Sequence, residues 1–293
     1  MKEKTPTMRN KLLSAYGLKV NPFSPDVPVE ALFVTDAVDA FCWRVEQQLF
    51  DGGFAAVNGE PGSGKSVVLR ILSYRLGKLR DVVVGVITRP QGSIADFYRE
   101  LGHLFGVKLS PHNRYAGAKV LRETWLDHIE SSTYRPVLLV DEAQEMRPSV
   151  MSELRLLSSM HLDSRALLTV VLAGDQRLIE SFRSPELLPI ASRIRSRLQM
   201  GYVPVETLRL ALDRLLEQAG NPSLMTDALC QTLVDHAAGN YRALMTMGDE
   251  LLHTAIQRKE PQIDEKLYLE LYGRRPTKAS RPKGSRRRSS TRA

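Results

Sequence analysis

The sequence predicts an α/β fold: a parallel sheet covered on both faces by helices, followed by a small helical lid subdomain. Three observations predict it. Short apolar runs alternate with amphipathic stretches through the first two thirds of the chain, strand patterns stop after Pro204, and helical patterns broken by Gly and Pro follow. Strands that alternate with helices give right-handed βαβ units and therefore a parallel sheet.

The individual elements follow from these patterns in chain order. Runs of apolar residues, typical of strands buried on both faces, predict strands at 54–58, 82–88, 136–141 and 167–173. Helical spacing predicts helices over 38–50, 66–77, 93–105, 115–131 and 148–160, and then over 205–219, 225–238, 241–258 and 263–271. We expect an N-terminal segment (1–35), an α/β core (36–203), a helical lid (204–272) and a disordered basic tail (273–293).

The composition is that of an ordinary globular protein, with 293 residues of which 43% are hydrophobic and 25% charged. Its two cysteines, Cys42 and Cys230, lie far apart in sequence without the spacing of a metal site, so we expect neither a disulfide nor a bound zinc ion. No apolar run is long enough to span a membrane, and the first residues lack the apolar core of a signal peptide. We expect a cytoplasmic protein that does not contact a membrane.

The positive charge is concentrated at the C-terminus. Residues 274–293 contain nine Lys or Arg and no Asp or Glu, so the net charge of +8 becomes about −1 for residues 1–273. This segment has no aliphatic side chain larger than Ala, which predicts disorder. A basic arm of this kind attracts a polyanion such as nucleic acid. The alternative is a tail that only improves solubility.

A complete phosphate-binding loop follows the first expected strand, with the pattern G-x-x-x-x-G-K-S over residues 59–66. Its glycines let the backbone aim N–H groups at phosphate oxygens, and the next helix presents its positive end. We expect Lys65 to reach the β and γ phosphates of ATP and the Ser66 hydroxyl to bind Mg²⁺. The expected nucleotide contacts are Gly59, Glu60, Pro61, Gly62, Ser63, Gly64, Lys65, Ser66 and Val67.

Two adjacent carboxylates follow the strand expected at 136–141. Asp141 ends the strand at the edge of the sheet where parallel sheets bind ligands, and we expect it to hold Mg²⁺ through water. Glu142 is the candidate that orients the attacking water and takes its proton. Alone, such a pair usually marks a solvated helix start. Because it comes about eighty residues after a complete phosphate loop, it indicates a Walker B motif.

Further polar residues lie beyond these two motifs. Asp175 and Gln176 follow another expected core strand, where a side chain can touch the γ phosphate or the attacking water. Three arginines, Arg193, Arg195 and Arg197, then occur at alternate positions at the far edge of the core. In a head-to-tail oligomer they would reach a neighbour's nucleotide, and otherwise they form a basic surface turn.

These motifs together resemble the AAA+ ATPases, and within them the ExeA-like group of secretion ATPases and TnsC-type or MuB-type transposition regulators. The similarity covers about residues 12–272 and includes Tyr16 to Phe23, Val140 to Gln144, Leu172 to Leu178 and Gly239 to Arg242. It implies an AAA+ αβα sandwich that hydrolyses ATP. It also implies Asp175 as sensor 1, with Gln176 as the alternative because the family more often has Asn or Gln there. The other implied roles are Arg193 or Arg197 as a finger acting in trans, Arg242 as sensor 2, and Asn21, Pro22 and Phe23 over the adenine.

The resemblance implies two functions. The first is an ATP-dependent regulator of DNA transposition that assembles on duplex DNA as a ring or filament and recruits or activates a transposase, with a targeting adaptor as a further candidate partner. Sequence-tolerant contact with phosphates fits exposed basic and amide side chains, here Arg89, Gln91, Arg114, Lys119 and Arg122. The alternative is a secretion-pathway ATPase that acts in envelope assembly. A nucleotide-binding scaffold with negligible turnover is disfavoured because Glu142 is present.

Overall fold

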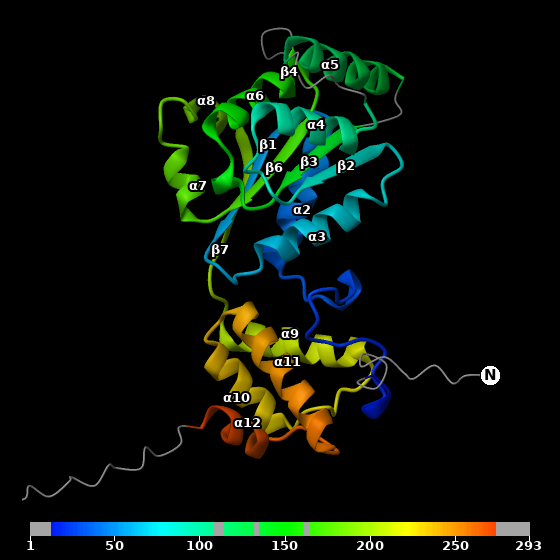
Figure 1. Ribbon diagram of the computed structural model, residues 1–293, viewed down its shortest axis with the longest axis vertical. Coiled ribbons are helices and arrows are strands. Elements are labelled where there is room, and N and C mark those ends of the chain that lie inside the picture. Colours follow the sequence, from blue (N-terminus) through cyan, green and yellow to red (C-terminus); the bar gives the residue numbers. More distant parts are fainter. Residues whose placement is uncertain (1–12, 108–113, 132–134, 161–164, 274–293) are drawn as a thin grey trace, which may run out of the picture.

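The chain folds into an α/β core and a helical lid, which lie one above the other along the long axis of the molecule (Figure 1). The structure is a computed structural model, and it describes residues 13–107, 114–131, 135–160 and 165–273. The arrangement confirms the predicted fold class. The expected basic tail lies outside the described residues.

The core is built on five parallel strands in the order β2-β3-β6-β1-β7. Their bounds are β1 (Gly53–Gly59), β2 (Val82–Ile87), β3 (Arg135–Val140), β6 (Thr169–Gly174) and β7 (Ile194–Met200). The four predicted strands are all found, with small shifts at their ends. The Walker strands β1 and β3 both pair with β6, so the phosphate loop and the carboxylates come out at the same edge of the sheet.

The sequence prediction missed strand β7, which pairs with β1 at the edge of the sheet. Its sequence mixes apolar residues with polar ones, and its less exposed side chains alternate with exposed ones. This is the pattern of an edge strand, which lacks the continuous apolar run of the other strands. The strand also contains Arg195 and Arg197, so two of the three arginines lie on the sheet itself.

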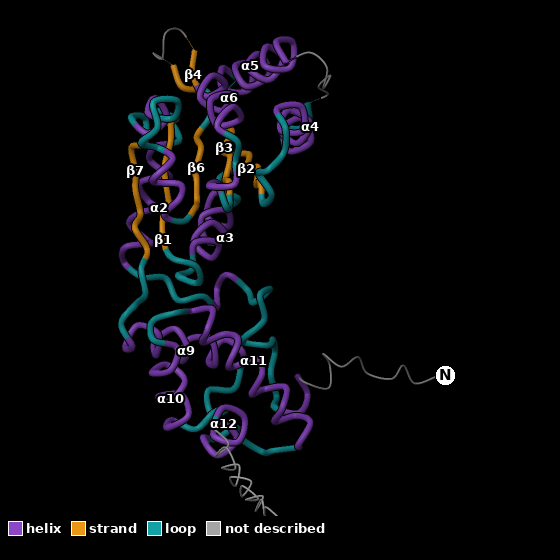
Figure 2. Tube along the Cα trace, turned by 60° about the vertical axis from the view of Figure 1, so that its left-hand side comes forward, coloured by secondary structure: helices purple, strands orange, loops and turns teal. Residues whose placement is uncertain are grey.

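Successive residues of each strand face opposite sides of the sheet, and this separates the core into two hydrophobic clusters. In β6, Val170 and Leu172 belong to one cluster, whereas Val171 and Ala173 belong to the other. The first side is covered by α4 (Ile94–Leu104), α5 (Arg114–Glu130), α6 (Pro148–Ser158), α7 (Gln176–Ser181) and α8 (Leu188–Ala191). The second is covered by α2 (Asp36–Gln48) and α3 (Lys65–Leu76), as Figure 2 also shows.

Short elements complete the core. Two 3₁₀ turns, η1 (Val29–Ala31) and η2 (Ala143–Glu145), precede α2 and follow β3 respectively. The strands β4 (Ser159–Met160) and β5 (Arg165–Ala166) form an antiparallel pair after α6. None of these was predicted, because two or three residues carry no periodicity that a sequence pattern can reveal.

The lid contains α9 (Val205–Ala219), α10 (Asp227–Ala237), α11 (Tyr241–Arg258) and α12 (Glu265–Tyr272). These four helices match the predicted ones closely because the chain marks their ends. Side chains of Thr226, Asn240 and Asp264 accept hydrogen bonds from backbone N–H groups of the helices they cap. Gly220 ends α9 in the left-handed conformation, with φ of 96°.

The segment from 13 to 35, here called the N-terminal strap, packs first on the lid. The N–H of Lys19 donates to the carbonyl oxygen of Ala219 at 2.8 Å. The side chain of Asn21 donates to Asp249 of α11 at 2.9 Å. Phe23 is buried, and a Cβ at Gly248 would lie 2.4 Å from its ring, so only glycine fits at that position of α11. The first half of the strap is therefore part of the lid's hydrophobic core.

The same strap then reaches the α/β core. Arg70, on the helix that follows the phosphate loop, donates to the carbonyl oxygens of Pro25 at 2.8 Å and Val27 at 2.5 Å. Val27 and Ala31 also form a small apolar cluster with Leu215 of the lid helix α9. Core and lid are thus joined by the strap as well as by the 201–204 connection, with the phosphate loop between the two connections.

Candidate functional site

The phosphate loop joins β1 to α3, and its backbone requires glycine at defined positions. Gly62 and Gly64 have φ of 83° and 101°, a left-handed conformation that is strained for residues with a side chain. At Gly59 a Cβ would lie 2.6 Å from the carbonyl oxygen of Met200, so the end of β7 leaves no room for one. The loop therefore has the backbone shape that directs N–H groups and the start of α3 toward an anion.

Lys65 sits inside this loop with only 8% of its surface exposed. Its ammonium group donates to the carbonyl oxygens of Gly59 at 2.9 Å and Glu60 at 3.1 Å. Two neutral carbonyls compensate only in part for removing a full positive charge from water. A phosphate oxygen would supply the missing negative charge, so the loop fits the phosphates of a nucleoside triphosphate.

A cleft of about 350 Å³ opens beside the loop, between core and lid. Several residues predicted to touch the nucleotide line it, namely Phe23, Pro61, Gly62, Gly64, Lys65, Ser66, Val67, Glu142, Asp175 and Arg242. Ser63 instead faces a neighbouring pocket, while Glu60 lines neither cavity. The fold thus brings together the start of α3, the residues after β3 and β6, and the start of α11.

The two carboxylates after β3 differ in environment. Asp141 is half-buried, and its side chain accepts a hydrogen bond from the N–H of Glu142 at 3.0 Å. Glu142 is exposed to the cleft and has a left-handed backbone, with φ of 51° and ψ of 41°. Such a conformation is uncommon for a residue with a side chain and concentrates at functional sites.

Asp175 lines the cleft, but its carboxylate is already bound. It caps α7 by accepting from the N–H of Arg177 at 2.9 Å, and the Arg177 guanidinium donates to it at 3.0 Å. Burial raises the pKa of Asp175, yet the hydrogen bonds and charge of Arg177 outweigh it, so this pKa lies below its ordinary value. Arg177 also pairs with Glu145 at 2.8 Å. Gln176 is exposed and does not line the cleft.

The predicted arginines divide between the two lobes. Arg242, at the start of α11, is exposed at the mouth of the cleft. Arg193, Arg195 and Arg197 do not line it. Arg193 donates to the carbonyl oxygen of Pro189 at 2.5 Å, Arg195 lies 3.4 Å from Asp51, and Arg197 donates to Ala191 at 3.0 Å. They lie along the sheet edge formed by β7, on the outside of the core.

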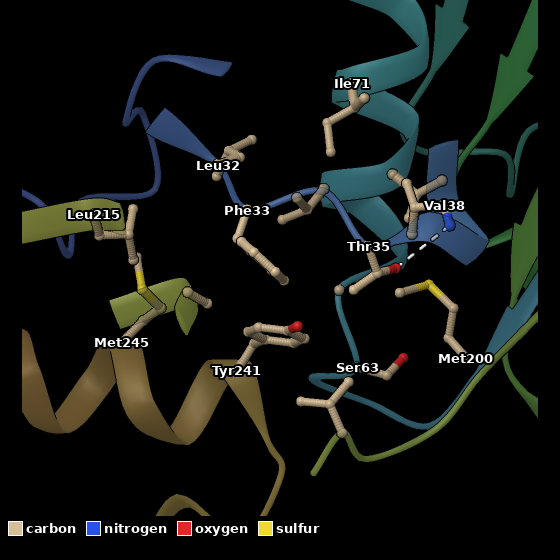
Figure 3. Close-up of a pocket in the computed structure, with 15 residues that line it drawn as sticks. Leu32, Phe33, Thr35, Val38, Ser63, Ile71, Met200, Leu215, Tyr241 and Met245 are labelled. Atoms are coloured by element: carbon tan, nitrogen blue, oxygen red, sulfur yellow. Dashed lines mark hydrogen bonds between the residues drawn. The ribbon is translucent and has the colours of Figure 1, made fainter. Parts of the chain in front are cut away.

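Of the three residues expected over the adenine, Phe23 lines the cleft. Asn21 and Pro22 do not line the cleft, and Phe23 packs mainly into the lid core. An almost wholly apolar pocket of about 120 Å³ instead adjoins the phosphate loop (Figure 3). The strap supplies Leu32 and Phe33, and α11 supplies Tyr241 and Met245.

The chemistry of this pocket suits a flat base attached to a nucleotide whose phosphates occupy the loop. Burial raises the pKa of the Tyr241 phenol above its ordinary value, in keeping with the apolar surroundings of the ring. Ser63 also lines the pocket, and its fully buried hydroxyl has no hydrogen-bond partner among the described residues. The sequence analysis did not assign Phe33, Tyr241 or Met245 to the nucleotide site, although Tyr241 lies within the Gly239-to-Arg242 segment, because the strap and α11 are far apart in the sequence.

The predicted DNA contacts lie on the core. Arg89 and Gln91 are exposed just after β2, and Lys119 is exposed on α5, where it lies 3.7 Å from Glu123. Arg114 and Arg122 belong to α5, but their side chains are outside the described residues. The role of this set stays a prediction.

Metal clusters and membrane-spanning helices are both absent from the part of the chain that the structure describes. No three side chains of His, Cys, Asp or Glu gather there in a manner that could hold a metal ion. A cation bound by Ser66 and Asp141 would take its remaining ligands from phosphate oxygens and water, as Mg²⁺ commonly does. None of the described helices combines the length and the apolar character needed to cross a bilayer.

The fold and the phosphate loop together define the class of protein. Residues 47–182 match the family model described as "AAA domain". With the five-stranded parallel sheet and the C-terminal helices, this match identifies an ATPase with the AAA+ architecture.

Known proteins add more particular similarities. The chain is 29% identical over 253 residues to General secretion pathway protein A of Aeromonas hydrophila, which covers 85% of this chain and 45% of that protein. The chain thus spans less than half the length of this relative. It is also similar to the ORC2 protein of Aeropyrum pernix in its ADP form, with a TM-score of 0.70 and 14% identity over 85% of this chain and 70% of the other. Drosophila ORC bound to DNA gives a TM-score of 0.67 and 17% identity over 92% and 68%. At these identities the two structures show the fold alone.

The apolar pocket generates a testable prediction. Tyr241→Ala should weaken ATP binding about tenfold, because a base in the pocket loses the contact of a half-buried ring, worth roughly 1.4 kcal/mol. Isothermal titration calorimetry with ATP and Mg²⁺ measures the affinity. Tyr202→Ala is the matched control, since Tyr202 is exposed and lines neither cavity. Equal affinities for the two variants would contradict the placement of the base.

Proposed function

We propose that this protein is an ATPase of the secretion-pathway protein A type, which uses ATP hydrolysis in the assembly of an envelope complex. The observation that carries the proposal is the similarity to the Aeromonas hydrophila protein, which spans 85% of this chain and therefore both core and lid. The comparisons support this alternative better than the prediction of a transposition regulator, since none of the relatives described above is a transposition protein.

In the proposed reaction, the phosphate loop and Lys65 hold the triphosphate of ATP. Ser66 and Asp141 are the residues that would hold Mg²⁺, which neutralises phosphate charge when bound. Glu142 takes a proton from water as the water oxygen attacks the γ phosphorus, and the bond to the bridging oxygen breaks to release ADP. Arg242, on the lid at the cleft mouth, would link occupancy of the γ phosphate to the position of the lid.

We further propose that a second copy of the chain completes each site. The arginines of β7 and its preceding turn do not line their own cleft, and they lie on an outer edge of the sheet. A head-to-tail neighbour would bring Arg193 or Arg197 to the γ phosphate, where a guanidinium stabilises the charge that develops in the transition state. The Arg197 guanidinium now donates to the backbone carbonyl of Ala191, so its release would give up a hydrogen bond to a neutral group.

The proposed cellular role predicts an export phenotype. Removing this protein from its host should cause exported proteins to accumulate inside the cell, because the envelope complex would not assemble. Wild-type protein and the control Gln231→Ala, which changes an exposed residue of α10, should restore export, whereas Glu142→Gln should not. Immunoblotting of secreted and cell fractions measures the result. Unchanged export in the deletion strain would overturn the secretion proposal.

Completion of the site by a neighbour predicts rescue in mixed assemblies. The ATPase rate should fall at least about 100-fold in Glu142→Gln, which lacks the proposed base. It should fall at least as much in Arg197→Ala, or in Arg193→Ala if that residue is the finger, because arginine fingers contribute roughly 10³ to 10⁵ in rate. Mixing the two inactive proteins should recover measurable turnover. At a mixed interface one copy supplies an intact Glu142 and the other an intact arginine. Absence of recovery at every ratio and with both arginine variants would show that the arginines do not act across an interface.

A second candidate function is DNA binding, in the service of transposition or another process. Two similar solved structures are complexes with DNA, namely those of Drosophila ORC and of the ORC1 protein of Aeropyrum pernix. The nine basic residues of 274–293 supply a segment suited to a polyanion. In this case the partners would be duplex DNA, a transposase and an adaptor, and the assembly would form on the DNA.

Fluorescence anisotropy with a labelled duplex separates the two functions. If the protein binds DNA, a non-hydrolysable ATP analogue should induce binding of the duplex at low salt, and Lys65→Ala should weaken that binding. Deletion of 274–293 should lower the affinity and should also make the affinity depend less steeply on salt concentration. The deletion removes nine basic side chains and therefore up to nine phosphate contacts. A protein that binds no duplex under these conditions contradicts the DNA proposal and leaves the secretion proposal.

A further inference from the structure

We propose that Gln144 is a positioning residue for ATP hydrolysis, which holds the Glu142 carboxylate toward the cleft by bridging it to the end of strand β6. This inference rests on the proposed role of Glu142 as the residue that takes the proton from water. It adds a second residue that decides how well Glu142 performs this task, without contact between Gln144 and the nucleotide.

Both polar atoms of the Gln144 carboxamide form hydrogen bonds. Its Nε2 donates to Oε2 of Glu142 in a short hydrogen bond, and its Oε1 accepts from the backbone N–H of Asp175 at 3.2 Å. The orientation of the amide is fixed by these partners. If it were flipped, an NH₂ group would face the N–H of Asp175, and a carbonyl oxygen would face a carboxylate.

The bridge connects the ends of two neighbouring strands. Glu142 and Gln144 follow β3, and Asp175 follows β6, while Val140 of β3 lies beside Leu172 of β6 in the sheet. Strand β6 pairs with β1 on one side and β3 on the other, so an amide hydrogen-bonded to the end of β6 has a defined position. The exposed Glu142 side chain is thereby attached to this fixed point.

The backbone beside the amide is shaped to receive it. A Cβ at Gly174 would lie 2.7 Å from Oε1 of Gln144 and 2.8 Å from Leu178, so any larger residue would displace the amide or the helix. At the other end, the left-handed backbone of Glu142 sets the direction in which its side chain leaves the chain. A strained residue and a close glycine contact thus flank the same hydrogen-bonded bridge.

The kinetic consequence follows from the flexibility of glutamate. An exposed Glu side chain with no partner samples many rotamers, and only a few of them place an oxygen beside the attacking water. The hydrogen-bonded bridge from Gln144 excludes most of the unproductive Glu142 rotamers before ATP binds. Groups that orient a reacting residue in this way commonly change rates 10-fold to 100-fold when removed, as seen for residues that orient metal ligands.

Three substitutions test the proposal. Gln144→Glu keeps the shape and the acceptor for Asp175 but removes the donor to Glu142, whereas Gln144→Ala removes both bonds. Each should lower kcat for ATP hydrolysis by about 10-fold to 100-fold, with the Kd for ATP and the melting temperature close to wild type. Gln231→Ala is the matched control, because Gln231 makes the same amide-to-carboxylate bond, to Asp235 at 3.0 Å, on the exposed surface of α10. It should not change kcat.

A combined variant separates positioning from a structural role. In a Glu142→Gln background, adding Gln144→Ala should lower the residual single-turnover rate less than twofold, because there is no longer a carboxylate to hold. A full additional loss there, or a kcat within twofold of wild type for both single variants, would overturn the proposal. A parallel fall in ATP affinity and melting temperature for Gln144→Glu would overturn it too. Failure of the proposed role of Glu142 is recognised separately, because Glu142→Gln would then retain the wild-type rate. If Glu142→Gln is slow but the Gln144 variants are not, only the proposal for Gln144 fails.

Discussion

The close packing of the phosphate loop against two other parts of the chain is the constraint on which the rest of the structure depends. On the core side, Gly59 leaves no room for a side chain beside the carbonyl of Met200, which ends β7. On the lid side, a Cβ at Gly62 would lie 2.3 Å from the side chain of Asn240, which caps α11. The loop therefore fixes the distance between sheet and lid as well as binding an anion. A nucleotide that enters it meets both lobes at once, and any change in the loop reaches both.

The N-terminal strap also links the lid to the α/β core through direct contacts. Its first half belongs to the lid core through Phe23, and its second half is held by Arg70 of α3. The helix α3 begins at Lys65, so the residue expected to reach the phosphates and Arg70, which holds the strap, lie on the same helix. Movement of the lid relative to the core would have to change the strap contacts, the short 201–204 connection, or both. If ATP moves the lid as proposed, these contacts would carry the movement to the surface that the proposed neighbouring copy meets.

Much of the fold could be predicted from the sequence because its signals are local. The continuous apolar runs of β1, β3 and β6 reveal buried parallel strands, and capping residues such as Thr226 and Asn240 mark the lid helices. The phosphate loop and the Asp141-Glu142 pair are likewise contiguous, so their meeting at one edge of the sheet was predictable. The edge strand β7 was missed because its alternating pattern resembles a polar surface segment. The apolar pocket was missed for a different reason: Phe33, Tyr241 and Met200 come from three distant segments, and only the docking of the lid brings them together. The pairing of Asp175 with Arg177 depends on how α7 begins, which no motif specifies.

The central claim is that the nucleotide lies between core and lid, with its phosphates in the loop and its base in the apolar pocket. Hydrogen–deuterium exchange with and without a non-hydrolysable ATP analogue tests it most directly. The account predicts slower exchange in three separate segments: the loop at 59–66, the strap at 29–35 and the start of α11 at 241–245. Lys65→Ala should abolish all three changes together. Protection confined to the loop, with the strap and α11 unchanged, would contradict the claim.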